Sequence, residues 1–350
     1  MSLRAAFIIP GDLGLPTGGY GYDRQVLKHA AAAGLELIHC PIPGGYPCPD
    51  PAALAGTAQA IAALPAGCPL LIDGLAYGAM PAAMIRAFDR PVVELCHHPL
   101  AVEPGLEAAT AARLHASERT AMALARAVIV TGQDTARMVA RDFAVAADKI
   151  TVALPGTERA RRARGSDSAT PRIIAVGSVI PRKAYDVLVK AMASLTDLDW
   201  TLRIIGATAH APDTVAEVET LIQALQLQNR IHLTGPMTAA QLDAAYDGAD
   251  LFVMSSLYEG YGMVIAEAMA RGLPIVATTG GAAADTLPPQ AGLKVPPGEN
   301  QPLAKAIRDM LTSPSLRSFF SDEAWRAGQA LPSWEDTART IARVIERTAR

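Results

Sequence analysis

The 350-residue sequence has few features of secreted, membrane-spanning or metal-binding proteins. Its four cysteines, Cys40, Cys48, Cys68 and Cys96, follow no C-x-x-C or Cys/His ligand spacing, which argues against a zinc site and a disulfide framework. No apolar run approaches the ~18 residues of a membrane-spanning helix. The first apolar stretch breaks at Pro10, too early for a signal peptide. We therefore expect a soluble, cytoplasmic protein.

Neither sign of charge is in large excess, and aromatic residues make up only 5% of the chain. A formal net charge of −3 gives no reason to expect nucleic acid as a partner. Half of the residues are hydrophobic, which is ample material for buried parallel strands. Because single cores stop growing at roughly 250–300 residues, the length predicts two domains.

Short apolar strands alternate with helices along the whole chain. The first half begins with a strand at 5–10, a glycine-rich loop at 11–21 and a helix at 22–33. The same pattern restarts with a strand at 172–176, after the polar, arginine-rich segment 158–170. The sequence predicts an α/β fold of two doubly wound parallel-sheet domains, 1–165 and 166–332, followed by an amphipathic helix at 333–350.

The first glycine-rich loop is not a dinucleotide fingerprint, because it lacks G-x-G-x-x-G and no acidic residue closes the next strand. Gly18 and Gly19 stand directly before the expected helix, where they would let a phosphate or an acceptor approach the backbone. A turn that needs positive φ explains such glycines equally well. A NAD-dependent enzyme is thus the weakest of the functional alternatives.

Two histidines, His97 and His98, follow the strand predicted at 91–96. Ligands bind parallel sheets outside the carboxyl ends of the strands, so we expect at least one imidazole in a site, as a hydrogen-bond donor. The alternative for either histidine alone is a structural role at the end of the strand.

The segment 255–285 carries the strongest functional pattern, a loop, a short helix at 263–270 and a buried strand at 275–278. Glu259 in the loop and Glu267 on the helix are spaced E-x7-E. A carboxylate on so apolar a helix is costly unless a polar group pairs with it. The loop and the first helical turn supply backbone amides suited to an anion; they comprise Gly260, Tyr261, Gly262, Met263 and Val264.

Arg182 and Lys183 lie between the strand at 172–176 and a helix expected at 185–195. Two adjacent surface cations ordinarily mean little. In this strand–loop–helix context they fit a diphosphate, with arginine as a bidentate donor and lysine as a point charge.

Together these stretches resemble the retaining glycosyltransferases of family 4. The E-x7-E segment continues into G-L-P-I-V-A-T, and V-G-S-V-I-P-R-K-A-Y-D is similar to the family's V-G-R-L-x-x-x-K-G-x-D. Lys183 then takes the place of the diphosphate-binding lysine. Ser178 stands where the family often has arginine, and Ala184 where it has glycine, so Arg182 is expected to replace the missing cation.

The resemblance implies a GT-B fold, with two Rossmann-like domains facing across a cleft and the last helix packed back on the first domain. It implies an acceptor in the N-terminal half and a nucleotide-sugar in the C-terminal half. Glu259 would hold sugar hydroxyls and Glu267 the ribose, while His97 or His98 would reach the sugar. The nucleobase is expected near the backbone of 234–237, which includes Gly235. The anomeric configuration would be retained, without a cofactor and without a metal.

The expected partners are a UDP-, GDP- or ADP-linked hexose and a saccharide, lipid-linked or small-molecule acceptor in glycan or polysaccharide biosynthesis. Weak contact with the inner face of a membrane is an alternative, suggested by the arginines of 158–170 and by the long helix expected at 103–125. The main alternative is a catalytically idle nucleotide-sugar-binding partner protein, which Ser178 favours. A nucleotide-sugar epimerase shares the architecture, and a glycogen-type phosphorylase would need a pyridoxal lysine that nothing marks.

Overall fold

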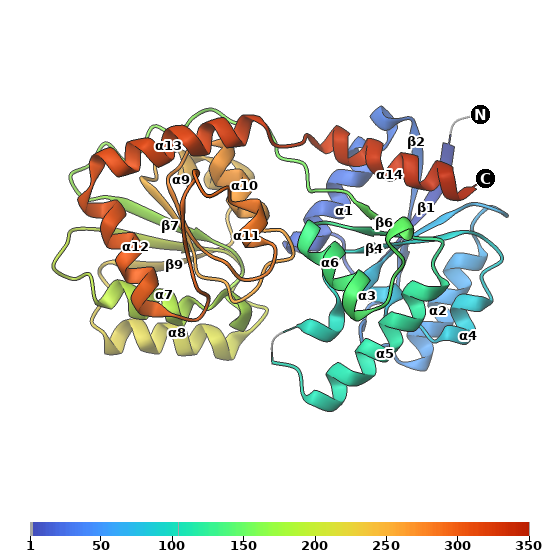
Figure 1. Ribbon diagram of the computed structural model, residues 1–350. Helices are drawn as coiled ribbons and strands as arrows, with labels where there is room; N and C mark the ends of the chain where they lie inside the picture. Colours follow the sequence, from blue (N-terminus) through green and yellow to red (C-terminus); the bar gives the residue numbers. More distant parts are fainter. Residues whose placement is uncertain (1–2, 104, 350) are drawn as a thin grey trace. The chain divides into compact units, whose positions relative to one another are not determined.

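The computed structural model describes residues 3–103 and 105–349, which form two compact units (Figure 1). The first unit combines the chain up to Gly156 with the segment from Pro332 onward, and the second runs from Thr157 to Leu331. The domain limit expected at residue 165 lies inside the second unit. There Ala163 N–H donates to Arg271 O at 2.8 Å. Two positions in the predicted segments, Pro104 and Arg350, lie outside the described residues.

The first unit is a six-stranded parallel sheet in the order β2-β1-β3-β4-β5-β6. Its strands are β1 Leu3–Pro10, β2 Leu35–Ile42, β3 Leu70–Asp73, β4 Val92–Cys96, β5 Ala127–Val130 and β6 Ile150–Val152. Its α-helices are α1 Gly18–His29, α2 Pro51–Ala62, α3 Gly74–Tyr77, α4 Ala82–Arg86, α5 Ala108–Leu124, α6 Gln133–Asp142 and α14 Trp334–Ala349, with 3-10 turns η1 Ala31–Ala33, η2 Leu100–Val102 and η3 Ala147–Lys149. All four residues of β3 are buried, as expected for a sheet covered on both faces.

The second unit is also a six-stranded parallel sheet, in the order β12-β11-β10-β7-β8-β9. Its strands are β7 Arg172–Val176, β8 Thr201–Ile205, β9 Ile231–Gly235, β10 Leu251–Met254, β11 Ile275–Thr278 and β12 Leu293–Val295. Its helices are η4 Pro181–Lys183, α7 Tyr185–Ala193, α8 Pro212–Ala224, α9 Ala239–Asp247, α10 Met263–Ala270, α11 Ala283–Thr286, α12 Asn300–Thr312 and α13 Pro314–Gln329. In Figure 1, α10 and α13 cover one face of this sheet and α7, α8 and α12 the other.

The alternation of strands and helices predicted from the sequence is confirmed, with differences at some element ends. Helix α1 begins at Gly18, four residues before the expected start, because the Thr17 side chain accepts a hydrogen bond from Tyr20 N–H at 3.3 Å. Gly18 and Gly19 therefore belong to the helix and not to the preceding loop. Helix α5 begins at Ala108, five residues after the expected start, because the turn η2 precedes it.

Short elements between 280 and 295 were not predicted. Helix α11 has four residues and strand β12 has three, too few for a periodic pattern to emerge. Strand β12 nevertheless closes one edge of the second sheet by pairing with β11.

None of the described helices is long and apolar enough to cross a membrane.

Candidate active site

The strand order of the second unit has a switch point beside β7. From β7 the chain proceeds to β8 and β9 on one side, whereas β10, β11 and β12 lie on the other. Ligands bind open α/β sheets at such a switch point, outside the carboxyl ends of the strands. The turn η4 follows β7 there, and the loop 255–262 follows the neighbouring strand β10.

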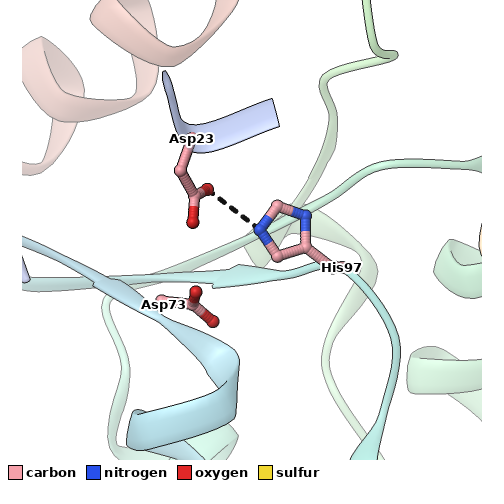
Figure 2. Close-up of side chains that lie close together, drawn as sticks. All are labelled: Asp23, Asp73 and His97. Atoms are coloured by element: carbon pink, nitrogen blue, oxygen red, sulfur yellow. Dashed lines mark hydrogen bonds and ion pairs between the residues drawn. The ribbon is translucent and has the colours of Figure 1, made fainter. Parts of the chain in front are cut away.

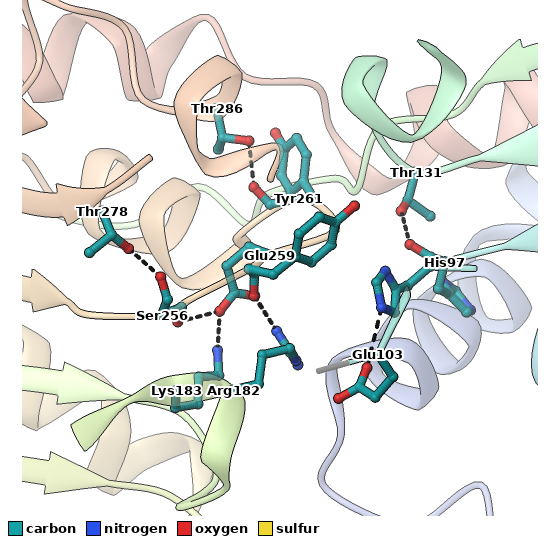
Figure 3. A network of polar contacts seen from close by, with 12 residues as sticks. His97, Glu103, Thr131, Arg182, Lys183, Ser256, Glu259, Tyr261, Thr278 and Thr286 are labelled. Atoms are coloured by element: carbon teal, nitrogen blue, oxygen red, sulfur yellow. Dashed lines mark hydrogen bonds and ion pairs between the residues drawn. The ribbon is translucent and has the colours of Figure 1, made fainter. Parts of the chain in front are cut away.

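The structure brings Lys183 and Glu259 together at this point. Lys183 Nζ donates to Glu259 Oε1 at 2.6 Å, and Ser256 Oγ donates to the same oxygen at 2.6 Å. Figure 3 shows Arg182, Lys183 and Ser256 converging on this carboxylate. The cation and the first glutamate of the E-x7-E pair are therefore direct partners.

Arg182 belongs to the same cluster and contacts the other carboxylate oxygen of Glu259. Its Nη1 lies 3.3 Å from Glu259 Oε2 and donates to Tyr258 O at 2.7 Å. The backbone supports the contact, because Leu257 N–H donates to Arg182 O at 2.8 Å. These bonds fix the turn η4 against the loop that carries Glu259.

Glu259 remains ionised in spite of its burial. Its exposed fraction is only 7%, and burial alone would raise its pKa. The positive charges of Lys183 and Arg182 outweigh burial and hold the pKa of Glu259 at about 2. One anion thus offsets one of the two cations, which leaves the cluster with a net charge of about +1.

The backbone around Lys183 is adapted to its side chain. A Cβ on Gly177 would lie 2.8 Å from Lys183 Cε, so a larger residue there would displace the end of the lysine side chain. Ala184 adopts the left-handed conformation, with φ 48° and ψ 47°. That conformation suits glycine, which the resembled family has at this position, and costs an alanine of order 1 kcal/mol.

Helix α10 begins at the same edge of the sheet. Gly262 precedes it with φ 88° and makes no side-chain cap, so the first amides of Met263 and Val264 belong to the unsatisfied donors of a helix start. Tyr261 is buried, and its carbonyl accepts a hydrogen bond from Thr286 Oγ1. The positive end of a helix thus adds to the charge of Arg182 and Lys183.

Glu267 is the fifth residue of α10 and is not part of the Glu259 cluster. Tyr246 Oη donates to Glu267 Oε2 at 2.9 Å, and the Arg271 guanidinium stacks on the Tyr246 ring at 4.6 Å. Burial raises the pKa of Glu267, partly offset by the Tyr246 hydrogen bond and by Arg271. Its polar partner is thus a tyrosine on α9, which makes the charge tolerable on an apolar helix.

Two further predicted donor positions lie on neighbouring loops. Ser178 follows β7, between Gly177 and Val179, and Val179 N–H donates to Ala207 O. Gly235 ends β9 with φ 72°, and no atom lies within 4 Å of its would-be Cβ. The space beside Gly235 is therefore open.

The first unit has its own polar cluster at a switch point, between β1 and β3. His97 Nε2 lies 3.0 Å from Asp23 Oδ1, and Asp73 lies beside them (Figure 2). The three side chains offer ligand atoms within 4.8 Å of one another and are the described residues whose spacing would suit a metal ion. Burial raises the pKa of Asp23 to about 8 and that of Asp73 to about 7.

His98 takes a separate place from His97. Its Nε2 lies 3.2 Å from Glu103 Oε2 in the loop before α5. The two histidines predicted as a pair therefore have different partners. Gly19 lies close to the first of them, since its would-be Cβ would be 3.3 Å from His97 Cδ2, whereas Gly18 has open space around it.

The sequence reasoning missed Asp23 and Asp73 as site residues. Asp73 was recognisable as a polar residue at the end of a buried strand, the same signal that drew attention to His97. Asp23 gave no such signal, because an aspartate within a predicted helix ordinarily faces solvent. Its exposed fraction is 0%.

Comparison with known proteins finds a family model that matches most of the second unit. The family model described as glycosyl transferases group 1 matches residues 156–326, just under half of the chain. D-inositol 3-phosphate glycosyltransferase of Kineococcus radiotolerans is 30% identical over 213 residues, which cover 55% of this chain and 48% of the relative. MMP alpha-(1->4)-mannosyltransferase of Mycolicibacterium hassiacum is 26% identical over 272 residues, with 73% and 65% covered. The chain thus spans about half to two thirds of these relatives.

Solved structures resemble the chain over nearly its whole length. Sucrose-phosphate synthase from Thermosynechococcus elongatus has a TM-score of 0.84 at 22% identity, covering 99% of this chain and 98% of that one. Anabaena HepE in complex with UDP-glucose has a TM-score of 0.81 at 18% identity, covering 99% and 100%. At such identities the likeness establishes the fold. The chain therefore has the GT-B fold of two Rossmann-like domains, and its segment 156–326, with the Lys183–Glu259 pair, matches glycosyl transferases group 1, which supports a glycosyltransferase.

Proposed function

We propose that the protein transfers a hexosyl group from a nucleotide-sugar to a saccharide, lipid-linked or small-molecule acceptor, with retention of anomeric configuration and without a metal. The observation that carries the proposal is the cluster of Arg182, Lys183 and Glu259 at the switch point of the second unit. It lies within the residues that match the family model. Anabaena HepE, a protein of the same fold, was solved with UDP-glucose, which supports a nucleotide-sugar as donor.

The chemistry follows from the charges at this point. Breaking the anomeric C–O bond leaves negative charge on a nucleoside diphosphate while the sugar becomes oxocarbenium-like. Arg182, Lys183 and the first amides of α10 are preorganised donors for that charge, and such groups usually make the largest contribution to catalysis. The leaving phosphate would then take the proton of the acceptor hydroxyl.

The remaining roles follow the resemblance. Glu259 would reach sugar hydroxyls, and Glu267, beside Tyr246, would hold the ribose. The nucleobase would use the open space beside Gly235. Ser178, Gly18 and Gly19 are proposed to approach the donor through their backbone.

A thermal unfolding series tests the donor site. Wild type and Lys183→Ala are compared with UDP-, GDP- and ADP-sugars and with the free diphosphates. A ligand at 100 times its Kd adds about 2.7 kcal/mol, a shift of a few degrees. Lys190→Ala is the matched control, because Lys190 lies one turn along α7 and pairs with Asp186 on the surface at 2.9 Å.

We expect one nucleotide series to raise the Tm of the wild type and of Lys190→Ala but not of Lys183→Ala. No shift with any donor or diphosphate would contradict the proposed function. With the donor known, the anomeric configuration of the product and the rate in EDTA test the retaining and metal-independent parts of the proposal.

A further inference from the structure

Side chains from three separate segments of the first unit meet at its switch point. Asp23 comes from α1, Asp73 ends β3 and His97 follows β4. Asp23 and Asp73 are 0% and 2% exposed, whereas the His97 side chain retains 20%. Two carboxyl groups are thus enclosed, and the imidazole has one side reachable from solvent.

The hydrogen bonds of this cluster leave one oxygen without a donor. His97 Nε2 contacts Asp23 Oδ1, and Leu75 N–H donates to Asp73 Oδ1 at 2.8 Å. The other oxygen of Asp23, Oδ2, is fully buried, and no donor among the described residues satisfies it. Figure 2 shows this oxygen on the side of Asp73.

Two facing carboxylates in so dry a place repel each other and lose hydration, so they cannot both be ionised without a positive partner. One proton on the pair relieves both the repulsion and the lost hydration, because a protonated carboxyl donates a hydrogen bond to its ionised neighbour. Such sharing of one proton by two carboxyls is known from the aspartic proteases.

We propose that Asp23 and Asp73 share one proton, and that this pair holds the His97 ring with Nε2–H toward Asp23 and Nδ1 facing solvent as a hydrogen-bond acceptor. Asp23 is a positioning residue in this arrangement. The ring can then accept a hydrogen bond from a hydroxyl of the sugar or the acceptor, and this last step alone depends on the proposed transferase function.

The surroundings of the pair support this protonation. Burial lowers the pKa of His97, which keeps the imidazole neutral at pH 7. The charged or titratable neighbours are Tyr20 and Arg24 on α1, Glu94 and Cys96 on β4, and Tyr22, whose ring meets His97 edge-on at 5.1 Å. Burial raises the pKa of Glu94 well above its usual value, so this carboxyl adds no negative charge. Arg24 lowers the pKa of Asp23 less than burial raises it.

The test replaces Asp23 by asparagine, which has the shape and the donor of a protonated aspartic acid. In Asp23→Asn the amide N–H can donate to ionised Asp73 while the amide oxygen still accepts from His97 Nε2–H. Asp23→Leu keeps the branching at Cγ but removes both bonds. The readouts are the Tm and the ¹⁵N resonances of the His97 ring, assigned by their loss in His97→Gln, and neither requires a substrate.

We expect wild type and Asp23→Asn to share a neutral ring with Nε2 protonated and Nδ1 bare between pH 6 and 8, and to have Tm values within a few degrees. In Asp23→Leu the ring signals should move to a tautomer mixture. A cationic ring, a bare Nε2, or loss of folding in Asp23→Asn but not in Asp23→Leu would overturn the proposal. Binding of one metal ion per chain by the wild type, but not by Asp23→Asn, would also overturn the proposal.

Discussion

Lys183 Nζ lies 2.6 Å from Glu259 Oε1, so the cation expected to bind the donor diphosphate already has a buried anionic partner. Binding of a diphosphate must therefore draw Lys183 partly away from Glu259, or form beside the intact pair. In either case the negative charge of Glu259 opposes binding of the diphosphate before the reaction begins. The same carboxylate holds the cation in place before the ligand arrives.

Replacing Glu259 by glutamine tests this opposition. In Glu259→Gln the amide oxygen can still accept from Ser256, but the charge that offsets Arg182 and Lys183 is gone. We expect the matching nucleoside diphosphate to bind several-fold to tenfold more tightly by calorimetry, because the local charge rises by one. Transfer should nevertheless slow, since the sugar hydroxyls lose their carboxylate.

Glu267→Gln is the control for this experiment. Glu267 belongs to the same segment, but its carboxylate is hydrogen-bonded to Tyr246 and not to Lys183. The glutamine should not tighten binding of the free diphosphate. If both variants bound the diphosphate more tightly to the same degree, the Lys183–Glu259 ion pair would not be the cause.

The first unit should become less stable as the pH rises. The folded-state pKa values of Asp23 and Asp73, about 8 and about 7, exceed the unfolded value of about 3.9. The stability they contribute is therefore complete below about pH 4 and is lost as the pH rises through the folded values. Each proton involved changes the free energy of unfolding by about 1.4 kcal/mol per pH unit. Urea midpoints at pH 5.5 and 8 should fall more in the wild type than in Asp23→Asn, and parallel losses would refute the assignment.

Two neighbouring glycines should differ in their tolerance of a methyl group. Gly18→Ala adds a Cβ into open space at the start of α1 and should be neutral or stabilising, by up to about 1 kcal/mol. Gly19→Ala places a Cβ 3.3 Å from His97 Cδ2, so the ring must shift by a few tenths of an ångström. We expect a changed His97 ring signal in Gly19→Ala alone. The NMR spectra of the two variants make the comparison, and identical ring signals would rule out the tight contact.

Trp334 should support His97 through Tyr22. The Tyr22 ring meets Trp334 edge-on at 5.5 Å, and its hydroxyl donates to Ala153 O at 2.9 Å. Trp334→Ala should destabilise the first unit by about 3–5 kcal/mol, as for other buried aromatics. Phe319→Ala is the control, because that ring is 52% exposed. Chemical denaturation measures both, and a change below 1 kcal/mol in Trp334→Ala would mean that α14 docks without this side chain.

Local patterns predicted most of the fold, because buried parallel strands and amphipathic helices each leave a periodic signal. The strand at 172–176 and the helix at 263–270 were predicted to the residue. The approach of Lys183 to Glu259 follows from the adjacency of β7 and β10, which periodicity cannot show. Here the resemblance to a known family, and not the residues alone, indicated that the two segments meet.

The carboxyl pair could not be predicted in this way. Asp23 and Asp73 come from segments fifty positions apart, and they meet because β3 pairs with β1 rather than with β2. Strand order is a property of the whole sheet. The unusual feature of Asp23, its complete burial, is likewise a consequence of packing and has no signature in the local sequence.

The first unit is assembled from both ends of the chain, and this has a consequence for its synthesis. A Cβ on Gly156 would lie 2.3 Å from Trp334 N, so the segment that leaves the unit touches the one that returns. On the ribosome, β1 to β6 emerge long before α14, whose Ile341, Val344 and Ile345 are buried in the finished unit. The apolar surface that awaits this helix stays uncovered while all of residues 157–331 are made. The first unit, most of which is translated before the second unit, is therefore completed after it.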